Sequence, residues 1–226
     1  MLGVEKAPPM ARIPLFPLNT VLFPEMVLSL HIFEERYKTM VRRCLESSEP
    51  FGVALIRSGK EAGGRAVPFA VGTTARIREV QHLDDGRMNL VAVGETRFRL
   101  RSLHQDAPYL VAEVEAASLE RGAEADLEEL ADRVTALFAE YYRLQVHVQG
   151  HWERTLALPS DPERLAYVVA AGMELEPLVK QELLEMDLLP AVLRREDELL
   201  GEAIPALTAR LAATRRQRFG RLGALN

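Results

Sequence analysis

The first half of the chain, up to about residue 117, alternates apolar and polar side chains with a period of two. The clearest case is TRFRLR at residues 96–101, which places three basic side chains on the face opposite Phe98: Arg97, Arg99 and Arg101. The same alternation recurs at residues 75–80, 88–93 and 109–115. It is typical of antiparallel strands with one face in a core and the other in water. We therefore expect a strand-rich first lobe.

One segment within this region follows the period of a helix instead. In FEERYKTMVRRCLES (33–47) the apolar residues form one stripe: Phe33, Tyr37, Met40, Val41, Cys44 and Leu45. This spacing is typical of an amphipathic helix that buries a single face. We expect a β-barrel or rolled sheet that one helix plugs or caps.

The second half of the chain, from about residue 124, has helical patterns. Ser160 with Glu163 forms a capping box, and Pro177 stands near the start of a further helical segment. Pro205 lies inside the last helical segment and predicts a kink or a break. We expect an α+β protein, with a β-rich lobe at residues 11–118 and a bundle of helices with short connections at residues 124–220.

Composition and charge narrow the class of protein. The 226 residues are 48% hydrophobic and 27% charged, as in ordinary globular proteins. The net charge of −5 argues against a general nucleic-acid binder. The single cysteine, Cys44, cannot form an internal disulfide, which fits a reducing compartment. No apolar run approaches the length of about 20 residues that a membrane helix needs. We therefore expect a soluble cytoplasmic protein without a membrane partner.

Sequence motifs that indicate catalysis are missing. The sequence has no G-x-x-x-x-G-K-[ST] phosphate loop, no G-x-G-x-x-G and no G-x-S-x-G. Cys44 lies on the apolar stripe of the expected helix, where a free cysteine behaves as a small buried hydrophobe. His147 and His151 have the spacing of two metal ligands on a helix, but Gly150 lies between them and no Cys pair is near. We predict no catalytic residue, no metal and no cofactor.

The face formed by Arg97, Arg99 and Arg101 has two interpretations. It could bind RNA phosphates, as small β-barrels often do. However, Glu113 and Glu115 lie on an expected neighbouring strand and could pair with these arginines. Aromatic residues for base stacking are not interleaved with the arginines, apart from a buried-looking phenylalanine. We favour a solvated, cross-paired face and keep RNA binding as the alternative.

The segment IPLFPLNTVLFPE (13–25) is too apolar for a surface linker and too rich in proline for a central strand or a helix. We expect a short edge strand at residues 13–18, because Pro14 and Pro17 cannot donate ladder hydrogen bonds. A turn, a second apolar piece ended by Pro24 and the strand at residues 26–32 then follow. The segment would form the entry to the barrel.

This segment and its continuation resemble the start of the Lon protease N-terminal (substrate-binding) domain family. The matching residues are Pro14-Leu15-Phe16-Pro17-Leu18, Val21, Phe23-Pro24, Leu30, Ile32-Phe33-Glu34 and Arg36-Tyr37. VGTTARIREV, GETRFRL and LVKQELLEMDLLPAVL are also similar, so the resemblance covers roughly residues 11–210. Relatives usually have Gly after the second Phe-Pro, where this chain has Glu25.

The resemblance implies a PUA-like β pseudobarrel followed by a helical lobe. It also implies a non-catalytic module that recognises unfolded, extended or tagged polypeptides, because the ATPase and the serine–lysine peptidase of Lon are not in this sequence. An adaptor role beside a separate Lon-type protease, and self-association as a homodimer, are the other partners that the family implies.

An apolar groove for extended chains is our leading hypothesis for the site. Its candidate residues all come from the proline-rich segment or follow it directly: Phe16, Leu18, Val21, Leu22, Phe23 and Met26. Binding there would combine apolar burial with main-chain hydrogen bonds at a sheet edge. The competing interpretation is that these side chains fill the core. An enzyme acting on a small molecule is a third hypothesis that no motif supports.

Overall fold

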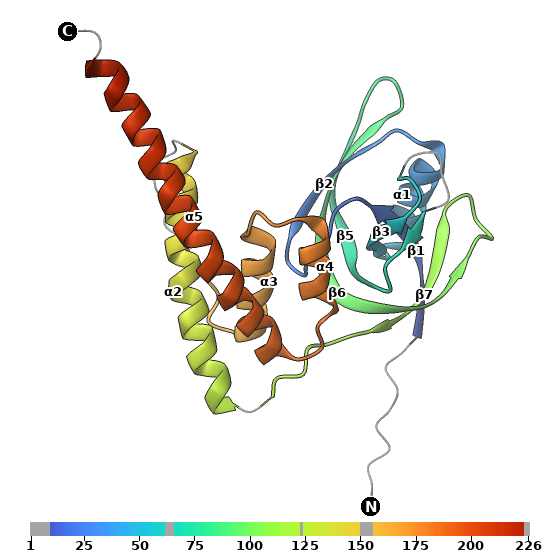
Figure 1. The fold of residues 1–226 in the computed structure, drawn as a ribbon. Coiled ribbons are helices and arrows are strands. Elements are labelled where there is room, and N and C mark those ends of the chain that lie inside the picture. Colours follow the sequence, from blue (N-terminus) through green and yellow to red (C-terminus); the bar gives the residue numbers. More distant parts are fainter. Residues whose placement is uncertain (1–9, 62–65, 123, 150–155, 224–226) are drawn as a thin grey trace, which may run out of the picture. The chain divides into compact units, whose positions relative to one another are not determined.

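The computed structural model describes residues 10–61, 66–122, 124–149 and 156–223, in which it has seven strands and five helices (Figure 1). The strands are β1 (Met10–Leu18), β2 (Val27–Ile32), β3 (Phe51–Ser58), β4 (Val67–Pro68), β5 (Val71–His82), β6 (Met88–His104) and β7 (Leu110–Ala116). The helices are α1 (Glu35–Ser47), α2 (Glu124–Val148), α3 (Pro162–Gly172), α4 (Pro177–Glu185) and α5 (Leu189–Gly223). The expected mixture of a strand-rich first half with one helix and a helical second half is confirmed.

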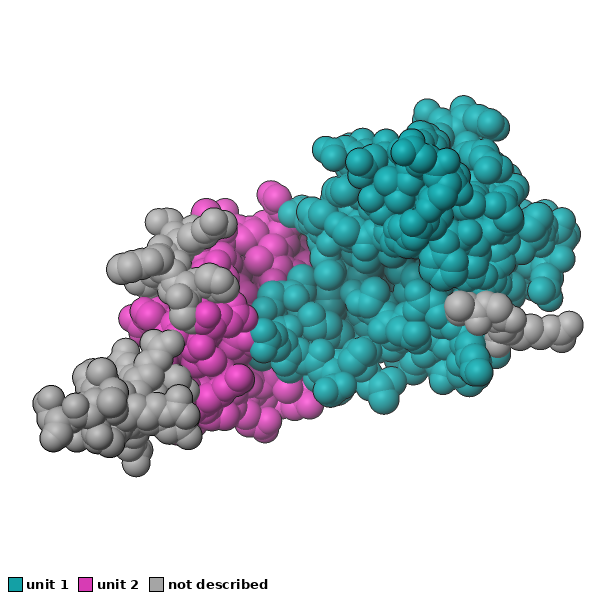
Figure 2. Space-filling model, turned by 90° about the horizontal axis from the view of Figure 1, so that it is seen from above, with its two compact units in different colours: residues 1–119, 170–187 teal, residues 120–169, 188–226 magenta. Residues whose placement is uncertain are grey.

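The chain divides into two compact units, coloured separately in Figure 2. Unit 1 comprises residues 1–119 and 170–187, and unit 2 comprises residues 120–169 and 188–226. The expected helical lobe at residues 124–220 does not coincide with unit 2, because the segment 170–187, with α4, belongs to the strand-rich unit. Helical periodicity identifies α4 as a helix but carries no information about the sheet against which it packs.

Five strands of unit 1 form a ring. They are paired in the order β1-β7-β6-β5-β3, and β1 also pairs with β3, in parallel, through residues 15–18. Two strands lie off this ring: β2 pairs with the first part of β6, and β4 pairs with β3. The sheet is therefore a ring with two added strands and not a simple barrel. The PUA-like assignment stays a prediction.

The core of the ring is closed by α1. Its buried side chains include Tyr37, Met40, Val41 and Cys44, as the helical stripe predicts. Phe33, however, precedes the helix and is 55% exposed, because α1 begins only at Glu35. Leu45, the last member of the predicted stripe, is 42% exposed. The two ends of the expected stripe therefore lie outside the core.

The proline-rich β1 is not a simple edge strand. Its first part pairs with β7, with Pro14 opposite Val111, and its last part pairs with β3, with Pro17 opposite Ala54. Apart from Leu15, where the partners change over, each position of β1 therefore has a strand on one side only. This arrangement tolerates proline, because the missing N–H can face the unpaired side. The expectation of an edge strand is thus wrong for β1 as a whole but describes each part separately.

The turn after Pro24 packs closely against β6. The main-chain N–H of Glu25 donates to the carbonyl of Gly94 at 2.8 Å, and the N–H of Gly94 donates to the carbonyl of Met26 at 3.0 Å. A Cβ atom on Gly94 would lie 2.3 Å from the carbonyl oxygen of Phe23, so only glycine fits there. Glu25 has a φ of 63°, in the left-handed region that glycine prefers. The glycine that the resemblance leads us to expect at this position would adopt this conformation without strain.

Unit 2 is built on two long helices, α2 and α5, which pack against each other. Val134 and Phe138 of α2 are buried, as are Leu193 and Leu200 of α5. The backbone of α5 continues through Pro205 without a break, contrary to the break that we considered. The expected bundle of helices stays a prediction beyond this pair.

Candidate functional site

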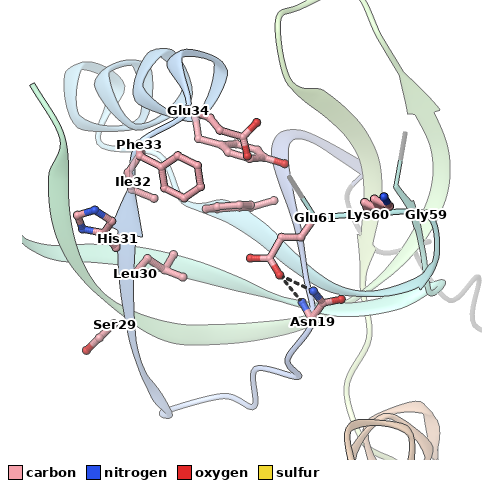
Figure 3. A pocket seen from close by; sticks show the side chains of 12 residues that line it. Asn19, Ser29, Leu30, His31, Ile32, Phe33, Glu34, Gly59, Lys60 and Glu61 are labelled. Carbon is pink, nitrogen blue, oxygen red and sulfur yellow. Dashed lines mark hydrogen bonds between the residues drawn. The ribbon is translucent and has the colours of Figure 1, made fainter. Parts of the chain in front are cut away.

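A pocket of about 550 Å³ lies beside β2 in unit 1 (Figure 3). Six consecutive residues, 29–34, line one side of it, and Asn19 with residues 59–61 lines the other. The volume is in the range of typical ligand sites, roughly 300–1,000 Å³. All of these residues belong to unit 1.

The main chain of β2 borders this pocket directly. Along the strand, Leu28 and Ile32 are buried and Leu30 packs against the core, whereas Ser29 and His31 are exposed. Because successive side chains of a strand point to opposite faces, the four consecutive lining residues of β2, 29–32, place its backbone in the wall of the pocket. Among the described residues, β6 is the only strand that pairs with β2.

Aromatic rings form the apolar part of the pocket. Phe16 of β1 and Tyr37 of α1 stack with their ring centroids 4.0 Å apart, and the guanidinium of Arg36 lies 4.4 Å from the centre of the Tyr37 ring. Burial raises the pKa of Tyr37 to about 12, so this phenol is neutral at physiological pH. Phe33 lies at the pocket with a large exposed surface. These rings offer an apolar surface for side chains of a ligand.

The polar side of the pocket contains two carboxylates in different situations. Glu34 accepts a hydrogen bond from Nε of Arg36 at 2.9 Å, which neutralises it. Glu61 accepts hydrogen bonds from the backbone N and from Nδ2 of Asn19, at 3.1 and 2.7 Å, as Figure 3 shows. Among the described residues the carboxylate of Glu61 forms no salt bridge, and its hydrogen-bond donors are neutral amides, while Nη2 of Arg36 donates to the main-chain carbonyl of Glu61 at 2.9 Å. Lys60 also lines the pocket.

The six residues predicted for peptide binding are mostly interior. Of these, the structure buries Phe16, Leu18, Val21, Leu22 and Phe23, each at 5% exposure or less, and Met26 is partly buried against the same core. Phe16 alone among them lines the pocket. The five buried side chains lie in the core of this structure, and peptide binding by these six residues stays a prediction.

The predicted arginine face is not a uniform surface. Arg97 is only 2% exposed, and its guanidinium donates to the main-chain carbonyls of Ala117 and Ser118 at 2.9 and 3.0 Å, and of Leu184 at 3.0 Å. Arg99 binds both carboxylate oxygens of Asp187, at 2.8 and 2.9 Å.

Arg101 donates to Glu115 at 2.6 Å. The expected pairing with the glutamates therefore occurs at Arg101, while Arg97 departs from the expected solvated face because the chain after β7 and after α4 covers it. These arginines do not present a shared phosphate-binding surface in this structure.

The other candidate side chains do not form a reactive site. Cys44 is buried, and burial raises the pKa of its thiol to about 11, which keeps it protonated. His147 lies in the last turn of α2, whereas His151 lies outside the described residues. Within the part of the chain that the structure describes, no group of three or more His, Cys, Asp or Glu side chains could hold a metal ion. In the same part, no helix is long and apolar enough to cross a membrane.

Comparison with known proteins identifies the family to which the chain belongs. Residues 12–201 match the profile of the ATP-dependent protease La (LON) substrate-binding domain. The chain belongs to this family. The Lon substrate-binding domain match includes all strands except the first two residues of β1, and it includes α1 to α4, so the pocket beside β2 lies within the shared region.

Similar proteins are known from several bacteria. The chain is 29% identical to Lon protease 2 of Myxococcus xanthus over 83% of its length, and 29% identical to Lon protease of Escherichia coli (strain K12) over 77%. The chain spans about a quarter of the length of these curated relatives, 24% and 23%.

A crystal structure of a Lon N-terminal domain protein from Xanthomonas campestris is also similar. It has 27% identity and a TM-score of 0.60, with 84% of this chain and 98% of that chain covered. The N-terminal domain of the Lon protease of the Mycobacterium avium complex, at 18% identity and a TM-score of 0.64 over the same coverage, shares the fold.

Sequence patterns missed most of the pocket. Phe33 was assigned to a buried helical stripe, although the Glu34–Glu35 pair that follows it is a signal that the helix begins later. Asn19 and Glu61 are in connecting segments that lie 42 residues apart, and their hydrogen bond has no periodic signal. Their proximity follows only from the parallel pairing of β1 with β3.

Proposed function

We propose that this chain is a polypeptide-recognition module that binds unfolded or extended chains at the pocket beside β2. The observation that carries the proposal is the position of this pocket, with its apolar rings and exposed Phe33, in a member of the Lon substrate-binding domain family. We further propose that it is non-catalytic, because the family match is to the substrate-binding part of Lon.

Exposed apolar surface beside a partly formed pocket supports binding of unfolded chains. A folded protein normally buries a large aromatic side chain, and an exposed one next to a pocket marks an interaction site more often than an isolated one does. Unfolded polypeptides expose the apolar side chains that such a site would cover. The buried residues of segment 13–25 then act as the support of the site and not as its surface.

The proposal is tested with a permanently unfolded protein, reduced and carboxymethylated, carrying a fluorescent label. Binding to the purified chain is measured by fluorescence anisotropy. We expect saturable binding, which Phe33→Ser weakens at least about threefold because it removes part of a large aromatic contact. Leu103→Ser is the matched control, because Leu103 is 39% exposed on β6 and does not line the pocket. No binding of the unfolded chain, or equal effects of both substitutions, would contradict the proposal.

An adaptor role would require a second partner. We propose a separate Lon-type protease as this partner, in view of the family to which the chain belongs. The measurement is degradation of the labelled unfolded protein by a Lon protease with ATP, in the presence and absence of the chain. A faster rate that depends on Phe33 is the expected result, and an unchanged or slower rate would contradict the adaptor role.

A further inference from the structure

We propose that the pocket takes an extended peptide as an additional strand along β2, with a basic side chain of that peptide against Glu61. This inference rests on the proposed function and specifies its binding mode. The backbone of β2, the size of the pocket and the charge of its wall each support one part of it.

The backbone argument concerns the side of β2 away from β6. In an antiparallel pair, alternate residues direct their N–H and C=O groups toward the partner, and the residues between them direct theirs to the opposite side. Among the described residues, β2 has no second strand partner, and its main chain forms no backbone hydrogen bond outside its pairing with β6. A main chain in extended conformation is the ligand that satisfies a row of such groups.

The size of the pocket fits a short stretch of strand. With a rise of about 3.3 Å per residue, a strand spacing of about 4.8 Å and a sheet spacing of about 10 Å, one strand residue occupies roughly 160 Å³. A pocket of about 550 Å³ therefore holds three to four residues. The lining residues of β2, 29–32, together with Phe33 span roughly 13 Å at the same rise, which is the length of four residues. Length and volume thus agree on the same occupant.

The charge of the pocket wall selects among extended peptides. Glu34 is already paired with Arg36, whose Nη2 also donates to the main-chain carbonyl of Glu61 at 2.9 Å. Among the described residues, the carboxylate of Glu61 itself forms no salt bridge and accepts hydrogen bonds from the amide groups of Asn19. A peptide with Lys or Arg near the middle would complement this carboxylate, whereas an acidic peptide or a nucleic-acid phosphate would be repelled. The apolar lining residues, among them Phe16 and Leu30, favour apolar side chains on the facing side of the peptide, and Lys60 is a cation in the same wall.

The test uses a capped octapeptide of alternating Val and Thr with one central Lys, and its counterpart with Glu in place of Lys. Affinity for the purified chain is measured by isothermal titration calorimetry. We expect the Lys peptide to bind at least about fivefold more tightly than the Glu peptide, since the exchange replaces an attraction to Glu61 by a repulsion. Glu61→Gln should reduce this preference, and Glu46→Gln, an exposed position of α1 outside the pocket, should leave it unchanged.

Strand addition is tested separately with N-methylated peptides. Methyl groups are placed on alternate amides of the Lys peptide in two opposite phases. Only one phase removes N–H groups that face β2, so one series should lose affinity by about three- to tenfold per hydrogen bond and the other should retain it. Equal loss in both phases, or none in either, would overturn strand addition.

The outcomes distinguish the two levels of the proposal. If the permanently unfolded protein binds through Phe33 but neither the phase of methylation nor the charge exchange matters, polypeptide recognition stands and the strand mode is overturned. If neither the unfolded protein nor any peptide binds, the proposed function itself is contradicted. Peptide binding that Glu61→Gln and Phe33→Ser leave unchanged would move the site away from this pocket.

Discussion

Arg97 reaches Asp187, ninety residues further along the chain, with Nη2 of its guanidinium 3.2 Å from the carboxylate. The same guanidinium donates to the carbonyls of Ala117 and Ser118, and to those of Leu184 and Met186. Residues 117–118 and 184–187 are the two segments at which the chain leaves unit 1. One buried side chain thus fixes both segments, 117–118 and 184–187, in unit 1.

Replacing Arg97 should destabilise the two segments that it fixes. Arg97→Met leaves several buried carbonyls without a donor, and we expect the free energy of unfolding of unit 1 to fall by roughly 2–4 kcal/mol. Arg97→Lys should not rescue it, because an ammonium group lacks the planar fork that serves several acceptors. Amide hydrogen exchange should increase first at residues 117–118 and 184–187.

Arg101→Met is the control for this prediction. Arg101 belongs to the same strand, but its side chain is 51% exposed, and within the described part of the chain Glu115 is its one ion-pair partner. Its replacement should change the free energy of unfolding by less than about 1 kcal/mol. Equal effects at Arg97 and Arg101 would contradict the role of the buried guanidinium.

Phe23 and Phe33 should respond to substitution in opposite ways. Phe23 is 1% exposed, so Phe23→Ala should lower the free energy of unfolding by about 3–5 kcal/mol. Phe33 is 55% exposed, and Phe33→Ala should lower it by no more than about 0.5 kcal/mol while weakening polypeptide binding. Urea denaturation and the anisotropy assay measure the two quantities. A stable Phe23→Ala variant that fails to bind the unfolded polypeptide would contradict this prediction and indicate that segment 13–25 forms the binding site.

Replacing Glu25 by glycine should stabilise the protein. Its φ of 63° is costly for a residue with a Cβ atom, whereas glycine adopts it freely. Glu25→Gly should raise the free energy of unfolding by up to about 1 kcal/mol, and Glu25→Val should lower it by roughly 1–2 kcal/mol because a β-branched residue is strained there. Thermal denaturation of both variants checks the order. Similar losses in both would show that the side chain of Glu25 matters more than its backbone.

Tyr37 predicts a loss of stability at alkaline pH. Burial raises the pKa of its phenol from 10.0 to about 12 in the folded chain. Between these values the unfolded chain releases a proton that the folded chain retains, so the free energy of unfolding falls as the pH rises through this range. The loss for two pKa units is at most about 2.7 kcal/mol.

The Tyr37→Phe variant isolates this contribution. It lacks the phenol, and its free energy of unfolding should therefore fall less steeply between pH 10 and pH 12 than that of the unsubstituted chain. Denaturation in urea at a series of pH values gives the comparison. Parallel pH profiles of the two proteins would contradict the assignment to Tyr37.

Local sequence patterns predicted the helices and strands of this protein better than they predicted which of these elements pack or pair together. Alternation identified β5, β6 and β7, and the 3.6-residue period identified the middle of α1, because both signals arise within one element. The pairing of β1 with both β7 and β3 joins distant segments and leaves no periodic trace. Alternation placed Arg97 in water, because it records which face of a strand is polar and not what later covers that face.

The sequence predicted the region of the chain near the pocket, but not most of the residues that line it. The resemblance to the Lon family drew attention to segment 13–25, and Phe16 from that segment does line the pocket. The residues that give the pocket its open strand and its charge, such as Ser29, His31 and Glu61, depend on tertiary placement. They have neither a motif nor a compositional signal.

The membership of α4 in unit 1 has a consequence for protein synthesis. Residues 120–169 belong to unit 2 and leave the ribosome before the segment 170–187 that completes unit 1. During that interval Arg97 lacks its acceptors at Leu184 and Met186, and Val71 lacks the hydrogen bond from Gln181. The strand-rich unit can therefore complete its folding only after most of residues 120–169 of unit 2, and then its own segment 170–187, have been synthesised. A gene fragment cut after β7 would encode a sheet without its last helix.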